Sequence, residues 1–200
     1  MASRPVQATI HRMGRPARQR RVTFEEYSAH EGAPNTRYEL FAGEIVAMNQ
    51  PTFRHAALQV SLAHELVAVL AGRCDVLGPT GVYCAATDEA FGPDLVVVCE
   101  PPTFDGKLGR ALTNPRAIVE IVSPSTSQVD TIEKLAAYTT IGSLREYVIV
   151  SQSRRLVTVY RRSEAGWTIE QLSAGRLVVC DATLSVDSIY DRVDKPASSP

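Results

Sequence analysis

The chain has 200 residues, of which 44% are hydrophobic and 22% are charged, and its formal net charge at pH 7 is −1. These values are typical of one soluble globular domain with a sizeable buried core. No apolar run reaches the roughly 18 residues of a membrane span, and no hydrophobic signal-peptide core follows the N-terminus. We therefore expect no membrane segment and a cytoplasmic location.

Charge is distributed unevenly along the chain. Residues 1–22 hold six arginines and no acidic residue, which leaves 15 of the 21 basic residues against all 22 acidic ones in the remainder. Such an arm has two interpretations, a disordered solvated leader or an electrostatic contact with nucleic acid. The remainder shows no basic patch. We expect a basic, disordered arm (1–21), a single domain (22–192) and a disordered tail (193–200).

The first elements after the arm are a short helix and a hairpin. In "TFEEYSAHEG", Thr23 is the expected N-cap, Glu26 completes a capping box and Gly32 ends the helix. "RYELFAGEIVAM" then reads as two short strands around Ala42-Gly43, which is a hairpin signal.

A long helix and a β-rich segment follow. Apolar residues recur with helical spacing from Arg54, and the pattern stops at Gly72. "PDLVVVCE" and "AIVEIVS" are apolar on both faces, which is typical of central strands covered from both sides. We expect strands at 74–78, 81–85, 93–100 and 117–123, with a polar loop at 101–114.

The last third of the chain predicts one helix and several strands. The helix spans "DTIEKLAAYTTIG", with Asp130 as N-cap and Gly142 as its end. "EYVIVS" and "RLVTVYRR" form a hairpin, and "GWTIEQL" and "RLVVC" form a further β-pair. Together the elements predict an α/β domain with a mixed central β-sheet flanked by α-helices.

The four cysteines are far apart and show no CxxC or Cys/His spacing. We therefore expect no zinc site, and we interpret the cysteines as buried free thiols in a reducing cytoplasm. They are Cys74, Cys84, Cys99 and Cys180.

Two carboxylates fall on the two apolar strands. Asp94 stands at the start of one and Glu120 lies inside the next. Neighbouring buried carboxylates repel each other unless a cation lies between them. An oxygen-rich site of this kind suits Mg²⁺ or Mn²⁺. The structural alternative is that Asp94 caps a turn after Gly92-Pro93 while Glu120 pairs with an arginine.

Lys134 adds a third candidate group. It lies early on the helix that follows the second strand, and such a helix packs back across the sheet. Its ammonium group could then reach the two carboxylates, orient an attacking water and stabilise a phosphoryl transition state. The alternative is a solvated helix lysine paired with Glu133 or Asp130.

Three further side chains are weaker candidates. His55 opens the long helix, where it either caps the helix or serves as a metal ligand through a neutral imidazole. Glu39 and Glu44 lie on opposite sides of the hairpin turn, so that one of them can face the same cleft. We rank His55 above both glutamates.

These motifs, taken in order, resemble a known family. "RYELFAGEIVAM", a histidine opening a helix, "GPDLVVV", "AIVEIVSPST", "EKLAAY" and "GSLREYVIVS" are similar to the Uma-two family of the PD-(D/E)XK nuclease superfamily. The resemblance covers residues 22–162 and implies a restriction-endonuclease-like core.

The resemblance also implies roles for individual residues. Asp94 and Glu120 would bind the divalent metal, and the backbone carbonyl of Ile121 would add a ligand. The superfamily lysine normally stands two residues after the glutamate, where this chain has Val122. In related groups the lysine lies on the following helix, which corresponds to Lys134.

The implied activity is Mg²⁺- or Mn²⁺-dependent hydrolysis of DNA phosphodiester bonds, with His55 as a further metal ligand. Tyr138 shares a helical face with Lys134 and would contact phosphate or pack in the core. Cutting both strands of a duplex favours a homodimer, for which the hairpin at 146–162 is a candidate interface. Two alternatives stay open: a catalytically inactive module for binding or assembly, and a nuclease acting on RNA or repair intermediates.

Overall fold

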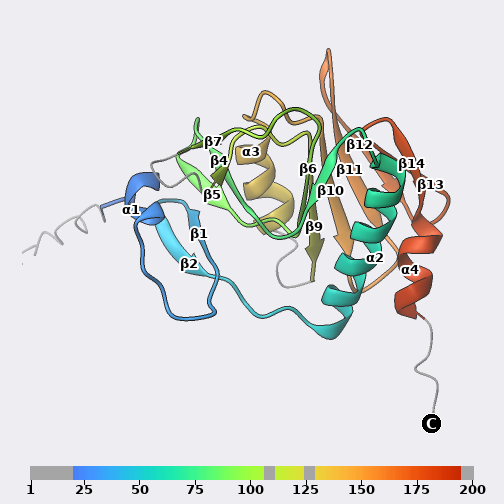
Figure 1. Ribbon diagram of the computed structural model, residues 1–200, viewed down its shortest axis with the longest axis horizontal. Coiled ribbons are helices and arrows are strands. Elements are labelled where there is room, and N and C mark those ends of the chain that lie inside the picture. The colour runs from blue at the N-terminus through green and yellow to red at the C-terminus, as the bar shows by residue number, and fades with distance from the viewer. Residues whose placement is uncertain (1–19, 106–110, 124–128, 195–200) are drawn as a thin grey trace, which may run out of the picture.

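A six-stranded mixed sheet forms the centre of the molecule (Figure 1). The structure, a computed structural model, describes residues 20–105, 111–123 and 129–194, of which 129–131 are described by their backbone alone. In spatial order the strands are β12 (Gly166–Leu172), β11 (Val157–Ser163), β10 (Glu146–Ser151), β9 (Ala117–Val122), β6 (Leu95–Val98) and β3 (Asp75–Leu77). β9 and β10 are parallel, and the remaining neighbours are antiparallel. The predicted mixed α/β architecture is confirmed.

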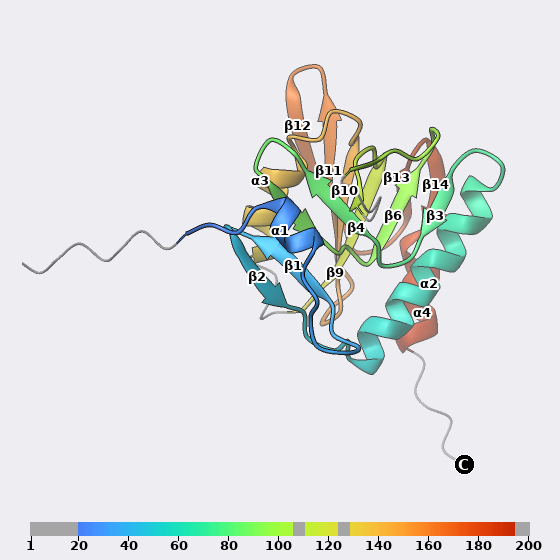
Figure 2. The ribbon, with the colours of Figure 1, turned by 60° about the vertical axis from the view of Figure 1, so that its left-hand side comes forward.

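A second sheet lies beside the first and carries the N-terminal hairpin (Figure 2). In spatial order its strands are β2 (Glu44–Ala47), β1 (Tyr38–Phe41), β5 (Glu89–Phe91), β4 (Gly81–Cys84), β8 (Ala111–Leu112) and β7 (Phe104–Asp105). The short helix α1 (Phe24–Ser28) packs Phe24 against this sheet, with the ring stacked on Tyr83. The loop expected at 101–114 therefore contains two short strands.

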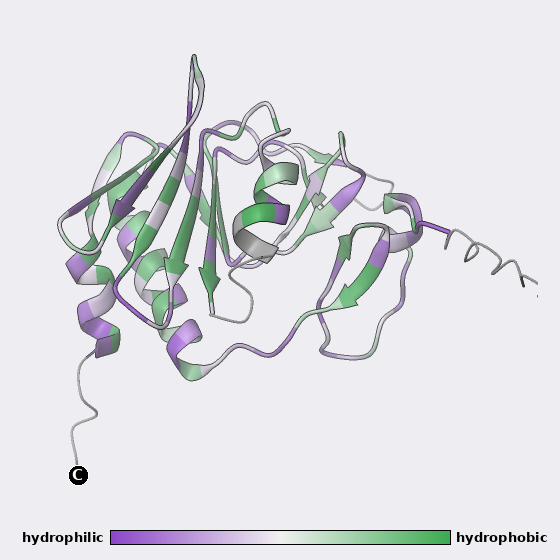
Figure 3. Cartoon of the chain, turned by 180° about the vertical axis from the view of Figure 1, so that it is seen from behind, coloured by the Kyte–Doolittle hydropathy of each residue, from purple (hydrophilic) through white to green (hydrophobic). Residues whose placement is uncertain are grey.

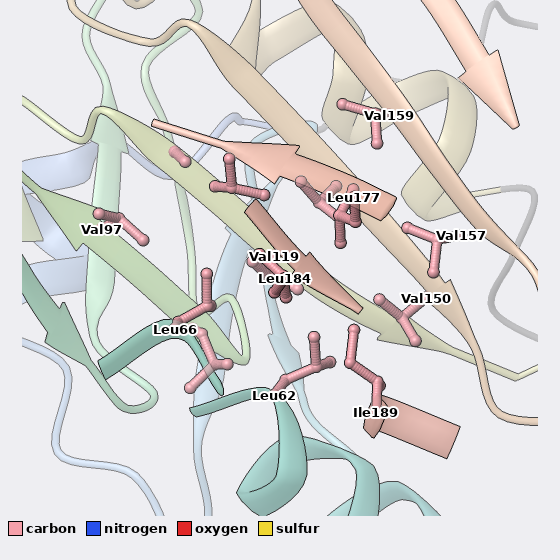
Figure 4. Packing of buried hydrophobic residues seen from close by; sticks show 14 of the residues in the cluster. Leu62, Leu66, Val97, Val119, Val150, Val157, Val159, Leu177, Leu184 and Ile189 are labelled. Carbon is pink, nitrogen blue, oxygen red and sulfur yellow. The ribbon is translucent and has the colours of Figure 1, made fainter. Parts of the chain in front are cut away.

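The two faces of the central sheet are covered by different elements. α2 (Phe53–Leu70), α4 (Val186–Asp194) and the hairpin of β13 (Arg176–Val179) and β14 (Ala182–Ser185) bury one face (Figure 4). The π-helical turn η1 (Val129–Lys134) and the short helix α3 (Leu135–Tyr138) lie on the other.

The apolar sequence of the central strands follows from this arrangement. All six residues of β9 are buried, with Ala117, Val119 and Ile121 on the α2 face, and Ile118 and Val122 on the α3 face. Figure 3 shows apolar residues concentrated in these strands. Because water is excluded from both faces, a charge on β9 has no solvent to contact and needs a protein partner.

Capping and periodicity in the sequence predicted correctly where α1 and α2 begin. Thr23 and Glu26 form the predicted capping box. Thr52 caps α2 by accepting from the backbone N–H of His55, which fixes the first turn of that helix. α2 ends at Leu70, just before Gly72, whose φ of +74° suits glycine.

Several predicted helix ends are wrong. α1 ends at Ser28, well before Gly32, and Ala29 is its C-cap. The helix after β9 begins at Val129, so Asp130 lies inside it and is not its N-cap. That helix ends at Tyr138, before Gly142.

The predicted pairing of the last strands is also wrong. β12 pairs with β11, and β13 pairs with β14, a strand that the sequence pattern did not indicate. β11 therefore lies between β10 and β12, so the β10–β11 hairpin has no free edge to offer as a dimer interface. The C-terminal helix α4 was also missed, and it extends through Asp194 into the expected tail. Residues 124–128 between the second apolar strand and the following helix, residues 1–19 of the expected arm and residues 195–200 of the expected tail lie outside the described residues.

Two cysteines correct the expectation of four free thiols. Cys74 and Cys99 form a disulfide, and they directly adjoin the pair Asp75–Val98 in the β3–β6 register. Their contact depends on strand pairing, which residues this far apart in sequence do not reveal. Cys84 and Cys180 are free and buried. Among the described residues, no helix has both the length and the apolar character to cross a membrane.

Candidate active site

Asp94 and Glu120 face each other across two antiparallel strands. Leu95 pairs with Val119 and Val96 with Ile118, so continuing the same register places Asp94 opposite Glu120. Opposite residues project from the same face of a sheet, here the face covered by α3. Both side chains are buried, with relative exposures of 4% and 5%. The sequence predicted neighbouring strands, and the register makes the two carboxylates direct neighbours.

Asp94 is held by groups from two elements. His55 Nε2 on α2 lies 2.9 Å from Asp94 Oδ1, and the backbone N–H of Ile121 donates to Oδ2 at 2.7 Å. Gln59, one turn further along α2, donates to the backbone carbonyl of Asp94 at 2.8 Å. Each carboxylate oxygen therefore has a fixed donor, and the orientation of Asp94 is set before any ligand binds.

Lys134 reaches Glu120 from the π-helical turn. Its Nζ lies 3.2 Å from Glu120 Oε1, and its relative exposure is only 5%. The same nitrogen lies 5.5 Å from the centroid of the Phe91 ring, which adds a cation–π contact. Val122, at the usual lysine position of the superfamily, is packed in the core instead. The alternative of a solvated helix lysine is therefore wrong.

Glu39 completes the group around the lysine. From β1 in the second sheet, its Oε1 accepts from Lys134 Nζ at 2.9 Å and from the backbone N–H of Gly92 at 3.0 Å. Glu44, beyond the hairpin turn, is exposed. The sequence ranks His55 above both glutamates. In the structure Glu39 is as closely engaged as His55: Glu39 Oε1 lies 2.9 Å from Lys134 Nζ, and His55 Nε2 lies 2.9 Å from Asp94 Oδ1. Its signal in the sequence is weak, because only the alternation with buried Leu40 indicates the face it occupies.

Tyr138 lies in the core and also contacts the site. Its hydroxyl donates to Glu120 Oε1 at 3.1 Å, and its ring packs against Phe91 and Tyr147. Burial, and then the nearby charge of Glu120, raise the pKa of the Tyr138 hydroxyl well above its ordinary value. Tyr138 therefore stays a neutral hydrogen-bond donor near neutral pH.

The donor set fits a hydrated cation better than a closed protein cage. Among the residues that the structure describes, no three His, Cys, Asp or Glu side chains are grouped as direct ligands of one metal ion. Two facing carboxylates suit Mg²⁺, which is commonly bound through one or two carboxylates and keeps water and phosphate oxygens as its other ligands. His55 Nε2 is engaged with Asp94 Oδ1, an arrangement typical of an imidazole that orients a ligating carboxylate.

The comparison with known families decides the classification. The model of Uma2, described as "Putative restriction endonuclease", matches residues 24–188, which is most of the chain. The chain belongs to the Uma2 family. This confirms the resemblance seen in the ordered motifs, and it covers Asp94, Glu120 and Lys134 together.

Curated relatives and a solved structure agree with the assignment to Uma2. Two uncharacterized proteins of Synechocystis sp. are similar, one 27% identical over 76% of this chain and 87% of its own, the other 30% identical over 85% and 92%. The crystal structure of "a putative nuclease belonging to DUF820" from Anabaena variabilis superposes with a TM-score of 0.71 at 17% identity, covering 86% of this chain and 99% of that one. At this identity the likeness shows the fold.

Proposed function

We propose that this Uma2 protein is a metal-dependent endonuclease that hydrolyses DNA phosphodiester bonds. The observation that carries the proposal is the contact between Lys134 and Glu120, with Glu120 directly opposite Asp94. These side chains come from three separate elements and are nearly fully buried, although burying them costs folding free energy. Family membership and the restriction-endonuclease-like fold support the same chemistry.

Asp94 and Glu120 are the proposed ligands of Mg²⁺ or Mn²⁺. The carbonyl of Ile121 is a further candidate, because the N–H and C=O of one strand residue point toward the same neighbour and this N–H already points at Asp94. When bound, the ion would polarise the scissile phosphate and lower the pKa of a coordinated water. The protein residues fix where that ion and the phosphate lie.

Lys134 is proposed to act on the substrate. Its ammonium group carries a positive charge at the edge of the carboxylate pair, where it can orient water and stabilise charge that develops on the phosphate. Glu39 and Glu120 hold the ammonium group by ion pairs and keep it aimed into the site. Because only the ammonium group needs to be in place, a lysine on η1 can replace one on β9.

His55 and Tyr138 are proposed to position the carboxylates. His55 fixes Asp94, and Tyr138 fixes Glu120, so neither needs to touch substrate. This differs from the sequence-based expectation that His55 is a metal ligand. Of the two interpretations of Tyr138, burial of its side chain in the core supports packing.

Plasmid cleavage tests the proposal. The intact chain is incubated with supercoiled plasmid and Mg²⁺ or Mn²⁺, and the nicked form is quantified alongside Glu120→Gln and Asp94→Asn. The exposed Arg176 on β13 lies away from the site, so Arg176→Ala serves as the matched control. Cleavage that needs metal, is lost in both site variants and persists in the control supports the proposal. Cleavage by Glu120→Gln at the parent rate contradicts it.

A second candidate function is a catalytically inactive module that keeps the nuclease fold. The observation that favours it is Val122, which replaces the strand lysine of the superfamily. This candidate predicts that Mn²⁺ does not change the melting temperature. A rise in melting temperature with Mn²⁺ that disappears in Glu120→Gln would exclude it, because a ligand that binds the native state stabilises that state.

Substrate, assembly and location are further parts of the proposal. DNA is preferred to RNA or repair intermediates because of the family, and parallel assays on matched DNA and RNA strands test that choice. A homodimer would cut both strands of a duplex, and light scattering measures it. With the β10–β11 hairpin inside the sheet, the edge strand β12, on which Ile169 is exposed, is the better candidate for the interface. A cytoplasmic location stays a proposal.

A further inference from the structure

A cavity of about 500 Å³ opens on the α3 face of the central sheet, beside the candidate active site. It lies at the end of the parallel strands β9 and β10, where β10 turns into β11. Neither the ion pairs of the site nor the proposed mechanism uses it. The lining residues that matter for its chemistry are Ile149, Arg154, Leu156, Thr158, Tyr160 and Gln171.

Strand register connects the cavity to the active site. Ile149 on β10 is the direct partner of Glu120 on β9, Thr158 on β11 is the partner of Ile149, and Gln171 on β12 is the partner of Thr158. These residues form one row across the same sheet face. Neighbouring strands are separated by about 4.8 Å, so the cavity begins one strand away from Glu120. A polymer bound at Glu120 can extend directly into it.

The rim of the cavity carries polar groups suited to a phosphate and a base edge. Arg154 is exposed at the β10–β11 turn and makes no hydrogen bond or ion pair with another described residue. Next to it, the hydroxyls of Ser151 and Ser153 lie 3.1 Å apart. Gln171 donates to Thr158 Oγ1 at 3.2 Å, which holds its amide in place while its carbonyl oxygen stays available to a donor.

The floor of the cavity is apolar. Ile149, Leu156 and Tyr160 line it, and the Tyr160 ring is held against Tyr147 in a stacked arrangement with centroids 6.1 Å apart. A site for inorganic phosphate alone would not need this surface. An apolar floor beside a guanidinium group and an amide matches a nucleotide, which has a flat base, polar base edges and an anionic phosphate.

We propose that this cavity is a nucleotide subsite, which holds one nucleotide of the substrate strand next to the scissile phosphodiester. Arg154 contacts the phosphate of that nucleotide, the base lies on the apolar floor, and Gln171 contacts the base edge. The inference rests on the proposed nuclease function for its substrate, but it concerns binding, so it is tested without metal and without cleavage.

The primary experiment measures binding of a short fluorescein-labelled single-stranded DNA to the intact chain in chelator, by fluorescence anisotropy. We expect Arg154→Ala to weaken binding about tenfold, the effect of losing one hydrogen bond to a charged group. Arg176→Ala, an exposed arginine on the opposite side of the sheet, should bind as the parent does. Equal binding by the Arg154→Ala variant and the parent overturns the inference.

Competition and kinetics separate the possible outcomes. A 5′-deoxynucleoside monophosphate should displace the probe at lower concentration than inorganic phosphate does. Gln171→Ala should reduce that difference in concentration. Equal competition by inorganic phosphate overturns the nucleotide assignment.

If the parent binds DNA through Arg154 but cleaves nothing with Mg²⁺ or Mn²⁺, the subsite stands and the nuclease proposal fails. If the parent cleaves, Arg154→Ala should raise KM with kcat little changed; unchanged KM and unchanged binding refute the subsite alone.

Discussion

Lys134 Nζ lies between the carboxylates of buried Glu120 and half-buried Glu39, 3.2 Å from Glu120 Oε1 and 2.9 Å from Glu39 Oε1, although the lysine and the glutamates come from three different elements. The ammonium group and the two carboxylates each lose hydration in the fold, and their mutual contacts offset that loss. The lysine therefore balances charge in the fold. We propose that it has a second role, as the cation that the proposed chemistry needs beside the metal.

Replacing Lys134 by methionine should separate these two roles. Without the ammonium group, buried Glu120 and half-buried Glu39 lose their ion pairs with it. We therefore expect the free energy of unfolding in chelator to fall by about 3 kcal/mol. Plasmid cleavage should be lost. Mn²⁺ should raise the melting temperature of Lys134→Met more than that of the parent, because the metal restores positive charge. Urea unfolding and calorimetry measure both effects, and a variant that nicks plasmid at the parent rate refutes the catalytic role.

Glu39→Gln should have a milder effect than Glu120→Gln. The amide oxygen of glutamine still accepts from Gly92, and Lys134 keeps its contact with Glu120. Because Glu39 touches the lysine and is not placed as a metal ligand, we expect roughly tenfold slower cleavage and unchanged Mn²⁺ affinity. Titration of Mn²⁺ by electron paramagnetic resonance gives the affinity. Loss of metal binding in Glu39→Gln would instead place Glu39 among the ligands.

His55→Ala should weaken Mn²⁺ binding about tenfold without abolishing it, because we propose that the imidazole positions Asp94 without binding the metal itself. The matched control is His64→Ala, which removes an exposed histidine from the same helix. The same resonance titration distinguishes the two variants. Complete loss of Mn²⁺ binding in His55→Ala would support the sequence-based expectation of a direct ligand.

Tyr138→Phe should lower the free energy of unfolding by about 1–2 kcal/mol, because the ring stays packed while Glu120 loses a hydrogen bond from a neutral donor. Tyr83→Phe removes a hydroxyl that donates to Asp88 nearer the surface and should cost less. Urea unfolding compares the two variants. Because we propose that Tyr138 does not touch substrate, KM for plasmid should not change, and a raised KM would show that it contacts phosphate.

The cysteines give a chemical test of strand pairing. Thiol titration of the unreduced chain should detect no reactive thiol in the native state and two after unfolding, because Cys84 and Cys180 are buried and Cys74 is bonded to Cys99.

Burial raises the pKa of both free thiols to about 12, from an ordinary value of 9.0. The folded state then binds more protons than the unfolded state between these values, so stability should fall as the pH rises from 9.0 toward 12.

Reduction should destabilise the parent by about 3 kcal/mol, because the disulfide restricts the unfolded chain. The control is the double variant Cys74→Ser/Cys99→Ser, in which reductant has no disulfide to break. Melting curves with and without reductant compare the two proteins. Four reactive thiols in the unreduced, unfolded parent would contradict the pairing.

The sequence by itself identified Asp94, Glu120 and Lys134 as candidates. Asp94 stands at the start of one apolar strand, Glu120 interrupts the next, and Lys134 lies on the helix that follows it. A carboxylate inside an apolar strand is unusual whatever the fold, and the ordered motifs around it lie within the match to the Uma2 family. Glu39 could not be ranked in the same way. Its importance comes from a contact with Lys134, 95 positions away in the chain, and no local pattern encodes that contact.

Local periodicity and capping determined the central strands, α2 and the start of α1, because these depend on neighbours along the chain. Tertiary structure decided which strands pair. That pairing brings Cys74 to Cys99 and makes β12 the edge strand next to β11. Tertiary structure also decided the contact of His55 with Asp94. It also decided that the row from Glu120 to Gln171 leads into a cavity. Such features arise from residues far apart in sequence, and only the register of the sheet brings them together.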